Sequence, residues 1–448
     1  MIGIAALGLA ACHESEVTVG ELQEVMVLPA IQNRDIDILF VVDSSPSMSD
    51  QQRALVASFP QMMDALATLD GGLPNLHIGV VTTDMGTTTA TGVGLAIPGS
   101  AGGCFGAGDD GVLRSGVVPE LGSALYISDV ANPDGTRARN YTGELRDVFS
   151  ALATVGAEGC GYEQPFRAMR RALENPANAG FLRPEANLAV VILSDEDDCS
   201  AKAPSFFGSD TQTLGPLESF RCTRFGVTCD TGGTTEADMN MVGAKSDCHD
   251  NPTSAYVDDV GQYVDFLANL KGDPNRVMVA AIVGDPTQVS VALKPPPQAT
   301  VPIPSLEPAC SFEGPNGLEV ADPAVRIGQL LAAFPSRSAL TSICSQDLSL
   351  SLTSIGYAAK KLVGDPCLDV PVADTSAAEG IQPACDVVEG PLGAETRMAA
   401  CDDTHSTDCW RLAPAPVECA TADKLRLQIA RAAAPTVQSY AHLSCLTR

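Results

Sequence analysis

The feature that most constrains the fold of this chain is a continuous apolar run at residues 38–42, which ends abruptly in the polar sequence Asp-Ser-Ser-Pro-Ser at 43–47. Such a run is typical of a strand buried on both faces of a parallel sheet. The loop that leaves this strand carries one carboxylate and two hydroxyls, on Asp43, Ser45 and Ser47. These oxygens suit a hard divalent cation such as Mg²⁺, Mn²⁺ or Ca²⁺ better than zinc. In the alternative interpretation, Asp43 and Ser45 only cap the following helix.

Strand and helix patterns alternate from residue 35 to residue 363. Further apolar runs predict strands at 76–81, 188–193 and 277–283. Apolar residues also recur at helical spacing, in stripes that begin at Leu55, Leu145, Phe166, Val257, Ile327 and Leu348. This alternation predicts an α/β fold with a doubly wound, mostly parallel sheet and right-handed crossovers.

Three long segments, near residues 85–142, 199–255 and 286–322, interrupt this alternation. They are rich in glycine, cysteine or proline, and each begins after the carboxyl end of a predicted strand. In a doubly wound sheet, ligands bind at this end of the strands. We therefore expect the three insertions to crowd the end of the sheet that holds Asp43, either as a shaped recognition surface or as a lid.

The strand that ends in Asp-x-Ser-x-Ser resembles the von Willebrand factor type A (VWA) family, because residues 43–47 match its metal ion-dependent adhesion site at every defined position. The resemblance covers residues 35–363. It implies a third-loop aspartate, which Asp195 supplies, and a second-loop threonine, at whose position this chain has Glu163. The implied metal ligands are Asp43, Ser45, Ser47, Glu163 and Asp195.

Both of these loop assignments have alternatives. Asp195 begins a run of four acids at 195–198, and the alternative is a solvated acidic loop without a ligand role. For Glu163, the alternative is the start of a helix, where a negative charge is favourable in any case. The resemblance implies that the site binds a divalent cation, Mg²⁺ in the first place, with Ca²⁺ and Mn²⁺ as alternatives. It also implies that an acidic side chain of a protein partner completes the coordination of the ion.

The N-terminal segment is apolar and ends in small residues before Cys12. The sequence Leu-Ala-Ala-Cys at 9–12 resembles the bacterial lipobox, which implies a signal peptide at 1–11 and a lipid on Cys12. Residues 12–34 then form a tether with the capacity for a short edge strand. The alternatives are an ordinary signal-peptide end or an apolar N-terminal strand. No other stretch of the sequence reaches the about 18 consecutive apolar residues of a membrane-spanning helix, so the lipid would be the only membrane anchor.

The sequence contains 15 cysteines, of which 14 remain when Cys12 is set aside. Eight of them precede residue 364 and six follow it, so both counts are even. Scattered cysteines in even number are typical of a disulfide framework in an exported protein, here in two separately cross-linked units. Residues 364–448 are also proline-rich and have few helical patterns, which predicts a small, disulfide-rich, β-rich C-terminal domain.

The net charge of −28 argues against a nucleic-acid partner, because phosphates require basic surfaces. The sequence has no nucleophile-elbow, zinc-protease or phosphate-loop motif, so we expect no enzymatic activity. The predicted function is cation-dependent protein binding by an extracytoplasmic lipoprotein of the bacterial outer membrane or cell surface. Two alternatives remain open. One is a structural envelope scaffold whose metal only stabilises the fold, and the other is a hydrolase activity in the C-terminal domain.

Overall fold

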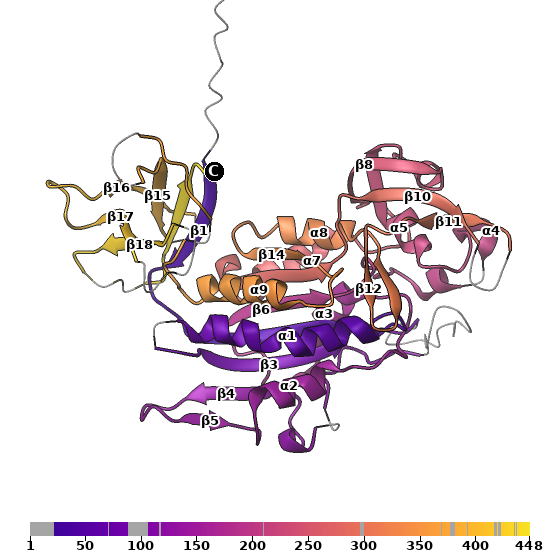
Figure 1. The fold of residues 1–448 in the computed structure, drawn as a ribbon, viewed down its shortest axis with the longest axis horizontal. Coiled ribbons are helices and arrows are strands. Elements are labelled where there is room, and N and C mark those ends of the chain that lie inside the picture. The colour runs from indigo at the N-terminus through magenta and orange to yellow at the C-terminus, as the bar shows by residue number, and fades with distance from the viewer. Residues whose placement is uncertain are drawn as a thin grey trace, which may run out of the picture.

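A seven-stranded, mostly parallel sheet forms the centre of the computed structural model (Figure 1). The structure describes residues 22–448 except 70, 88–105, 116, 117, 209, 296–299, 369, 377–380, 392, 416–418, 420–422, 434 and 436. The parallel strands are β2 (Asp35–Val42), β3 (Asn75–Thr82), β6 (Asn187–Leu193), β9 (Val277–Val283) and β14 (Ser338–Ser342). Two antiparallel strands, β4 (Ile127–Ala131) and β5 (Arg137–Arg139), complete the order β14-β9-β6-β2-β3-β4-β5.

Helices cover both faces of this sheet. One face packs against α1 (Ser49–Ala67), α2 (Leu145–Ala153) and α9 (Ser349–Leu362), and the other against α3 (Pro165–Glu174), α7 (Val260–Leu270) and α8 (Val325–Ala332). Both faces of β2 are buried, which explains why its residues 38–42 are all apolar: Phe40 contacts the aromatic rings of α1 and α2, whereas Leu39 and Val41 belong to the core on the α3 side. The predicted doubly wound α/β fold is thus confirmed.

The central strand β2 begins at Asp35, three residues before the apolar run that predicted it. Asp37 lies inside this extension and is fully buried. The Arg183 guanidinium Nε donates to its carboxylate at 2.8 Å, and the backbone N–H of Arg183 donates at 2.7 Å. A buried carboxylate within a strand is tolerated because it is paired, and the apolar pattern alone could not show that pairing.

The second and third insertions form one structure. Strands β7 (Val227–Thr231), β8 (Gly243–Asp250), β10 (Val289–Lys294) and β11 (Ile303–Leu306) make a four-stranded sheet in the order β11-β10-β8-β7. Helices α4 (Thr211–Leu214) and α5 (Phe220–Gly226) precede β7, and α6 (Glu236–Met239) joins β7 to β8. A hairpin of β12 (Cys310–Gly314) and β13 (Gly317–Ala321) follows β11. Short 3₁₀ helices lie at Pro119–Leu121, Pro176–Asn178, Pro204–Phe207 and Pro274–Arg276.

A second unit lies at one end of the central sheet, and the four-stranded sheet β11-β10-β8-β7 lies at the other end (Figure 1). This second unit is a six-stranded sheet of β1 (Gln23–Pro29), β15 (Cys385–Gly390), β16 (Thr396–Ala400), β17 (Cys409–Pro414), β18 (Leu425–Ala430) and β19 (Tyr440–Cys445). The predicted disulfide-rich β domain is therefore confirmed. Its edge strand β1 comes from the segment assigned to the tether, and it is held there because Val25 and Met26 are buried in the same core as Leu443. The predicted signal peptide and Cys12 lie outside the described residues.

Six disulfides between described cysteines join residues that lie on the same side of residue 364, as the even counts predicted. The pairs are Cys199–Cys222, Cys229–Cys248, Cys310–Cys344, Cys367–Cys419, Cys385–Cys445 and Cys401–Cys409. Cys160 is also disulfide-bonded, and Cys104 lies outside the described residues. This number of disulfides indicates an oxidising, extracytoplasmic compartment. None of the helices in the described part of the chain has the length and apolar character needed to cross a membrane.

Candidate metal centre

The first loop of the candidate site follows directly from β2. Asp43 is fully buried, and its two oxygens accept hydrogen bonds from the Ser45 backbone N–H and the Ser194 hydroxyl, each at 2.7 Å. The Ser45 and Ser47 hydroxyl oxygens lie 3.0 Å apart. The helix-capping interpretation is wrong, because the N-cap of α1 is Met48 and no side chain caps this helix end. Burial raises the pKa of Asp43 to about 6, although both hydrogen bonds oppose this shift.

The second loop lies directly on the first. The Gly159 N–H donates to the Ser44 carbonyl at 2.8 Å, and a Cβ on Gly159 would lie only 2.1 Å from Ser44 Oγ. Gln52 of α1 joins both loops, because its Nε2 donates to the Asp43 carbonyl at 2.8 Å and to the Gly156 carbonyl at 2.7 Å. Gln52 could not be identified from the sequence, since one amide on a helix carries no signal of the loops it will bridge.

Glu163 is 1% exposed, and neither of its carboxylate oxygens has a hydrogen-bond partner among the described residues. Burial raises its pKa well above the ordinary value, and the negative charges of Glu196 and Asp43 add to the shift. The helix-start interpretation is not supported, because α3 begins at Pro165 and the N–H groups of its first turn donate to Asp198 and Ser200 rather than to Glu163. The Phe166 N–H donates to Asp198 Oδ1 at 3.0 Å.

The third loop brings Asp195 to the same place. It is 4% exposed, and its Oδ1 has no partner within the described chain. Burial raises its pKa strongly, the charge of Asp43 adds to this, and the Ser47 hydroxyl opposes it. Two further acids, Glu196 and Asp322, were not among the predicted ligands. Burial raises the pKa of half-buried Glu196, and it raises the pKa of Asp322 to about 6. The Asp322 N–H also donates to the Asp195 carbonyl at 2.8 Å.

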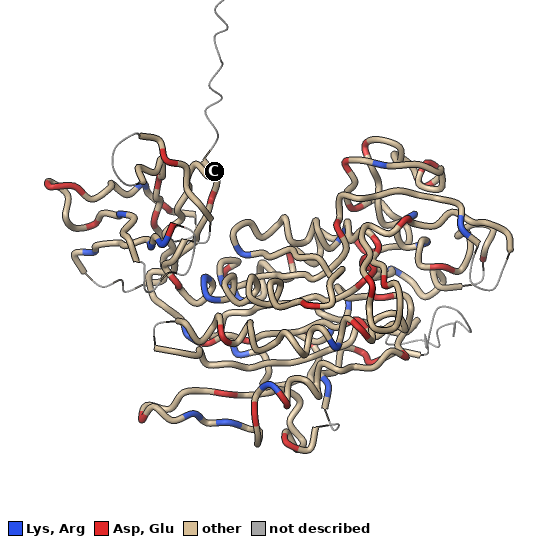
Figure 2. Tube along the Cα trace, in the orientation of Figure 1, with Lys and Arg blue, Asp and Glu red and all other residues tan. Residues whose placement is uncertain are grey.

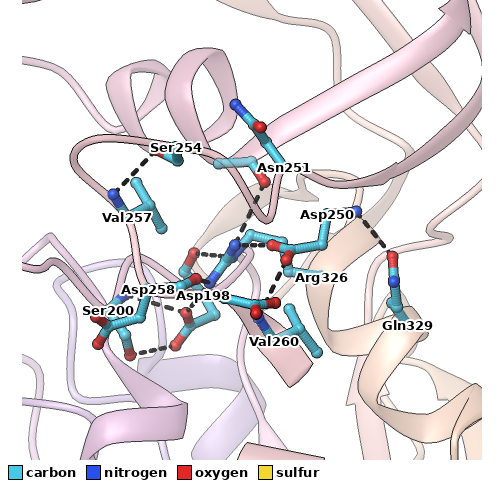
Figure 3. A network of polar contacts seen from close by, with 12 residues as sticks. Asp198, Ser200, Asp250, Asn251, Ser254, Val257, Asp258, Val260, Arg326 and Gln329 are labelled. Carbon is cyan, nitrogen blue, oxygen red and sulfur yellow. Dashed lines mark hydrogen bonds and ion pairs between the residues drawn. The ribbon is translucent and has the colours of Figure 1, made fainter. Parts of the chain in front are cut away.

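The run of four acids at 195–198 divides into two functions. Asp197 accepts hydrogen bonds from the first N–H groups of α8, those of Arg326 at 2.9 Å and Ile327 at 3.1 Å. Asp198 pairs with the fully buried Arg326 guanidinium at 3.0 Å, and Asp250 at the end of β8 pairs with the same group (Figure 3). The loop is therefore not solvated, as the alternative interpretation had it, whereas a ligand role of Asp195 stays a prediction. Half of this run holds the loop in place, which leaves Asp195 and Glu196 to face the first loop.

All three insertions contribute to this end of the sheet, as predicted. In the first, Asp109 accepts the Thr82 hydroxyl hydrogen at 2.6 Å. In the second, the Cys199 N–H donates to the Glu163 carbonyl at 2.8 Å, and in the third, the Asn316 amide donates to Asp50 at 2.7 Å. Figure 2 shows the acidic segments gathered where these insertions meet the central sheet. The side chains of the site are mostly covered, but Ser47 is exposed and marks its open side.

The residues present fit a hard cation. Oxygen donors converge from three loops, and the oxygens of Glu163 and Asp195 that lack partners would each be costly to bury as isolated charges. Within the described ranges, however, no three His, Cys, Asp or Glu side chains form a group that could hold a metal ion by themselves. Two of the five predicted ligands are serines. The full set, which stays a prediction, is Asp43, Ser45, Ser47, Glu163 and Asp195.

The fold and these loops define an extracytoplasmic, disulfide-braced protein with a doubly wound α/β domain and a separate β-sheet unit. No protein-family model and no curated protein matches the chain. Solved structures with a similar fold include proximal thread matrix protein 1 from the mussel byssus, at 10% identity and TM-score 0.31 over 76% of this chain and 50% of that one. The hypothetical protein BatB from Bacteroides thetaiotaomicron has 9% identity and TM-score 0.29 over 73% of this chain and 98% of that one.

A third similar structure is von Willebrand factor type A from Catenulispora acidiphila, at 11% identity and TM-score 0.26 over 95% of this chain and 66% of that one. This chain thus spans about half the length of the mussel protein that it matches. At TM-scores of 0.31 and below, these similarities do not assign the chain to a family or give it a function.

Proposed function

We propose that this chain is a divalent-cation-dependent protein-binding component of the bacterial cell envelope. The observation that carries the proposal is the buried, unpartnered carboxylate oxygens of Glu163 and Asp195 beside the Asp43 loop. Asp43, Ser45, Ser47, Glu163 and Asp195 would hold the ion, with Mg²⁺ favoured and Ca²⁺ or Mn²⁺ as alternatives. A bound cation would neutralise these carboxylates and offer a coordination position to a carboxylate of the partner protein.

The residues of this chain orient the site before any ion binds. Ser194 and the Ser45 N–H fix the plane of the Asp43 carboxylate, and Gln52 holds the first and second loops together. Exposed Ser47 leaves one side of the site accessible to a partner. The role proposed for this arrangement is binding rather than catalysis.

A structural scaffold is the second candidate, and the burial of Glu163 favours it. A buried glutamate is able to satisfy an ion from within the chain, so the cation would then stabilise the fold without contacting a partner. The two candidates differ in what the loss of Asp43 does to partner binding and to stability.

Asp43→Asn is expected to abolish the rise in melting temperature that MgCl₂ causes in the wild type. A ligand at about 100 times its Kd stabilises the folded state by about 2.7 kcal/mol, and the variant should lose this increment. Without cation, the variant should melt no lower than the wild type, because it removes a charge that burial disfavours. Thermal melts in EDTA and in MgCl₂ measure both quantities, and exposed Asp64→Asn serves as the control.

If MgCl₂ raises the melting temperature of Asp43→Asn as much as that of the wild type, Asp43 does not belong to a cation site. If the site also binds a partner, envelope proteins retained on the immobilised wild type in MgCl₂ should be released by EDTA and should not be retained by Asp43→Asn. Loss of the thermal shift with unchanged retention supports the scaffold instead.

We also propose that a lipid on Cys12 anchors the chain to the membrane. Cys12→Ser is expected to move the protein from the membrane fraction to the soluble fraction, because the thioether-linked lipid is its only anchor in this proposal. Fractionation of cells that express either form, with labelled fatty acid as tracer, measures the effect. Unchanged membrane association of the serine variant, or label that persists on it, contradicts the proposal.

A further inference from the structure

Three buried hydroxyls in the loops of the candidate centre, those of Ser44, Tyr162 and Thr83, have no hydrogen-bond partner among the described residues. Thr83 directly follows β3 and is fully buried, and its Oγ1 has no hydrogen-bond partner in the part of the chain that the structure describes. The adjacent Thr82 is different, since its hydroxyl donates to Asp109 at 2.6 Å. Buried hydroxyls are normally hydrogen-bonded, so an unpaired one needs an explanation.

The register of the sheet places Thr83 beside Asp43. Val42 of β2 pairs with Thr82 on one side and with Leu193 on the other, so the next positions are Thr83, Asp43 and Ser194 across the three strands. The backbone continues this register, because the Thr83 N–H donates to the Val42 carbonyl at 3.2 Å and the Asp43 N–H donates to the Leu193 carbonyl at 2.9 Å. Residues in register on neighbouring strands direct their side chains to the same face of a sheet.

Thr83, Asp43 and Ser194 lie on the α3 side of the central sheet, and the second loop lies on this same side. Leu39, Val41 and Val81, which have the same alternation as Asp43 and Thr83, pack into the core on the α3 side. Glu163 immediately precedes α3, and the Gln164 N–H donates to the Thr83 carbonyl at 3.2 Å. The hydroxyl of Ser194, which is in register with Asp43 and Thr83, reaches the site, because it donates to Asp43 Oδ2 at 2.7 Å.

We propose that the Thr83 hydroxyl is a further ligating group of the cation site, directed to it from the end of β3 on the side of Asp43 opposite Ser194. This inference rests on the proposed cation-binding function. It explains why the hydroxyl stays unpaired in a buried position where valine would have the same shape. It also adds a neutral oxygen donor to a site whose other buried donors are mainly carboxylates, and hard cations accept such mixed sets.

The test separates a ligating role from a structural one. Thr83→Val keeps the branched shape and removes only the hydroxyl, so the cation-free protein should melt at the wild-type temperature or above, since an unsatisfied buried group is lost. Its affinity for Mg²⁺, titrated as MgCl₂ by calorimetry, should fall by about 10-fold or more. Thr83→Ser should retain the affinity. Thr82→Val is the matched control, and it should lower the melting temperature without changing the affinity, because its hydroxyl bonds to Asp109.

Each outcome decides the question. If the wild type binds MgCl₂ and Thr83→Val binds it equally well, the inference about Thr83 is overturned and the proposed function stands. If Thr83→Val lowers the melting temperature of the cation-free protein as Thr82→Val does, the role is structural and the inference is likewise overturned. If the wild type binds neither MgCl₂ nor CaCl₂ or MnCl₂, the proposed function fails, and the inference fails with it.

Discussion

Replacing Arg326 with methionine is expected to lower the free energy of unfolding of the α/β domain by about 3–5 kcal/mol. Arg326 is fully buried, and its guanidinium pairs with Asp198 and Asp250, which are themselves buried. It also donates to the Asp258 carbonyl at 2.7 Å (Figure 3). Methionine fills similar space but leaves two buried carboxylates without a counter-charge. Removing only one partner of a buried ion pair is strongly destabilising, because the remaining charge stays buried and uncompensated.

The measurement is urea denaturation followed by far-UV circular dichroism. The matched control is Arg146→Met, which removes an arginine whose contact with Asp147 is more than half exposed on both sides. Such a surface pair contributes about 0–1 kcal/mol, so this variant should unfold close to the wild type. If Arg326→Met stays within about 1 kcal/mol of the wild type, the buried network is not what fixes the third loop.

The strands and the loop acids could be predicted because their signals are local. A strand buried on both faces must be apolar throughout, and the carboxyl ends of parallel strands must meet, so Asp43 and Asp195 could be placed together from sequence. Arg326 could not be predicted, since it meets Asp198 across 128 positions of sequence and nothing near either residue indicates the other. The same holds for Asp322, which enters the site from the end of the third insertion.

Long-range strand pairing was the other part that sequence could not show. Strand β8 belongs to the second insertion and β10 to the third, yet they pair in one sheet, with β9 of the central sheet between them in the chain. Strand β1 pairs with β19 at the other end of the molecule. Short alternating segments predict strands without identifying the partner, because pairing depends on which core the apolar side chains reach.

Removing the Cys385–Cys445 disulfide by double substitution with alanine is expected to destabilise the C-terminal sheet by about 4 kcal/mol. The bond closes a loop with a sequence separation of 60, so its loss restores much conformational freedom to the unfolded chain. Cys445 lies in β19, opposite Cys385 of β15 on one side and Gln23 of β1 on the other, so β1 should become less protected against hydrogen exchange. Urea unfolding can be followed by the fluorescence of Trp410, the only tryptophan of the sequence, which lies in this sheet.

The matched comparison is the double alanine variant of Cys401–Cys409, whose sequence separation is only 8. The loop-closure relation gives it about 2.5 kcal/mol, so it should destabilise the same sheet less. If the two variants unfold alike, loop entropy does not set the stability of this unit. Loss of protection in β1 only with the Cys385–Cys445 variant would show that the two ends of the chain are stabilised together through β19, because β1 has no other strand neighbour in the described sheet.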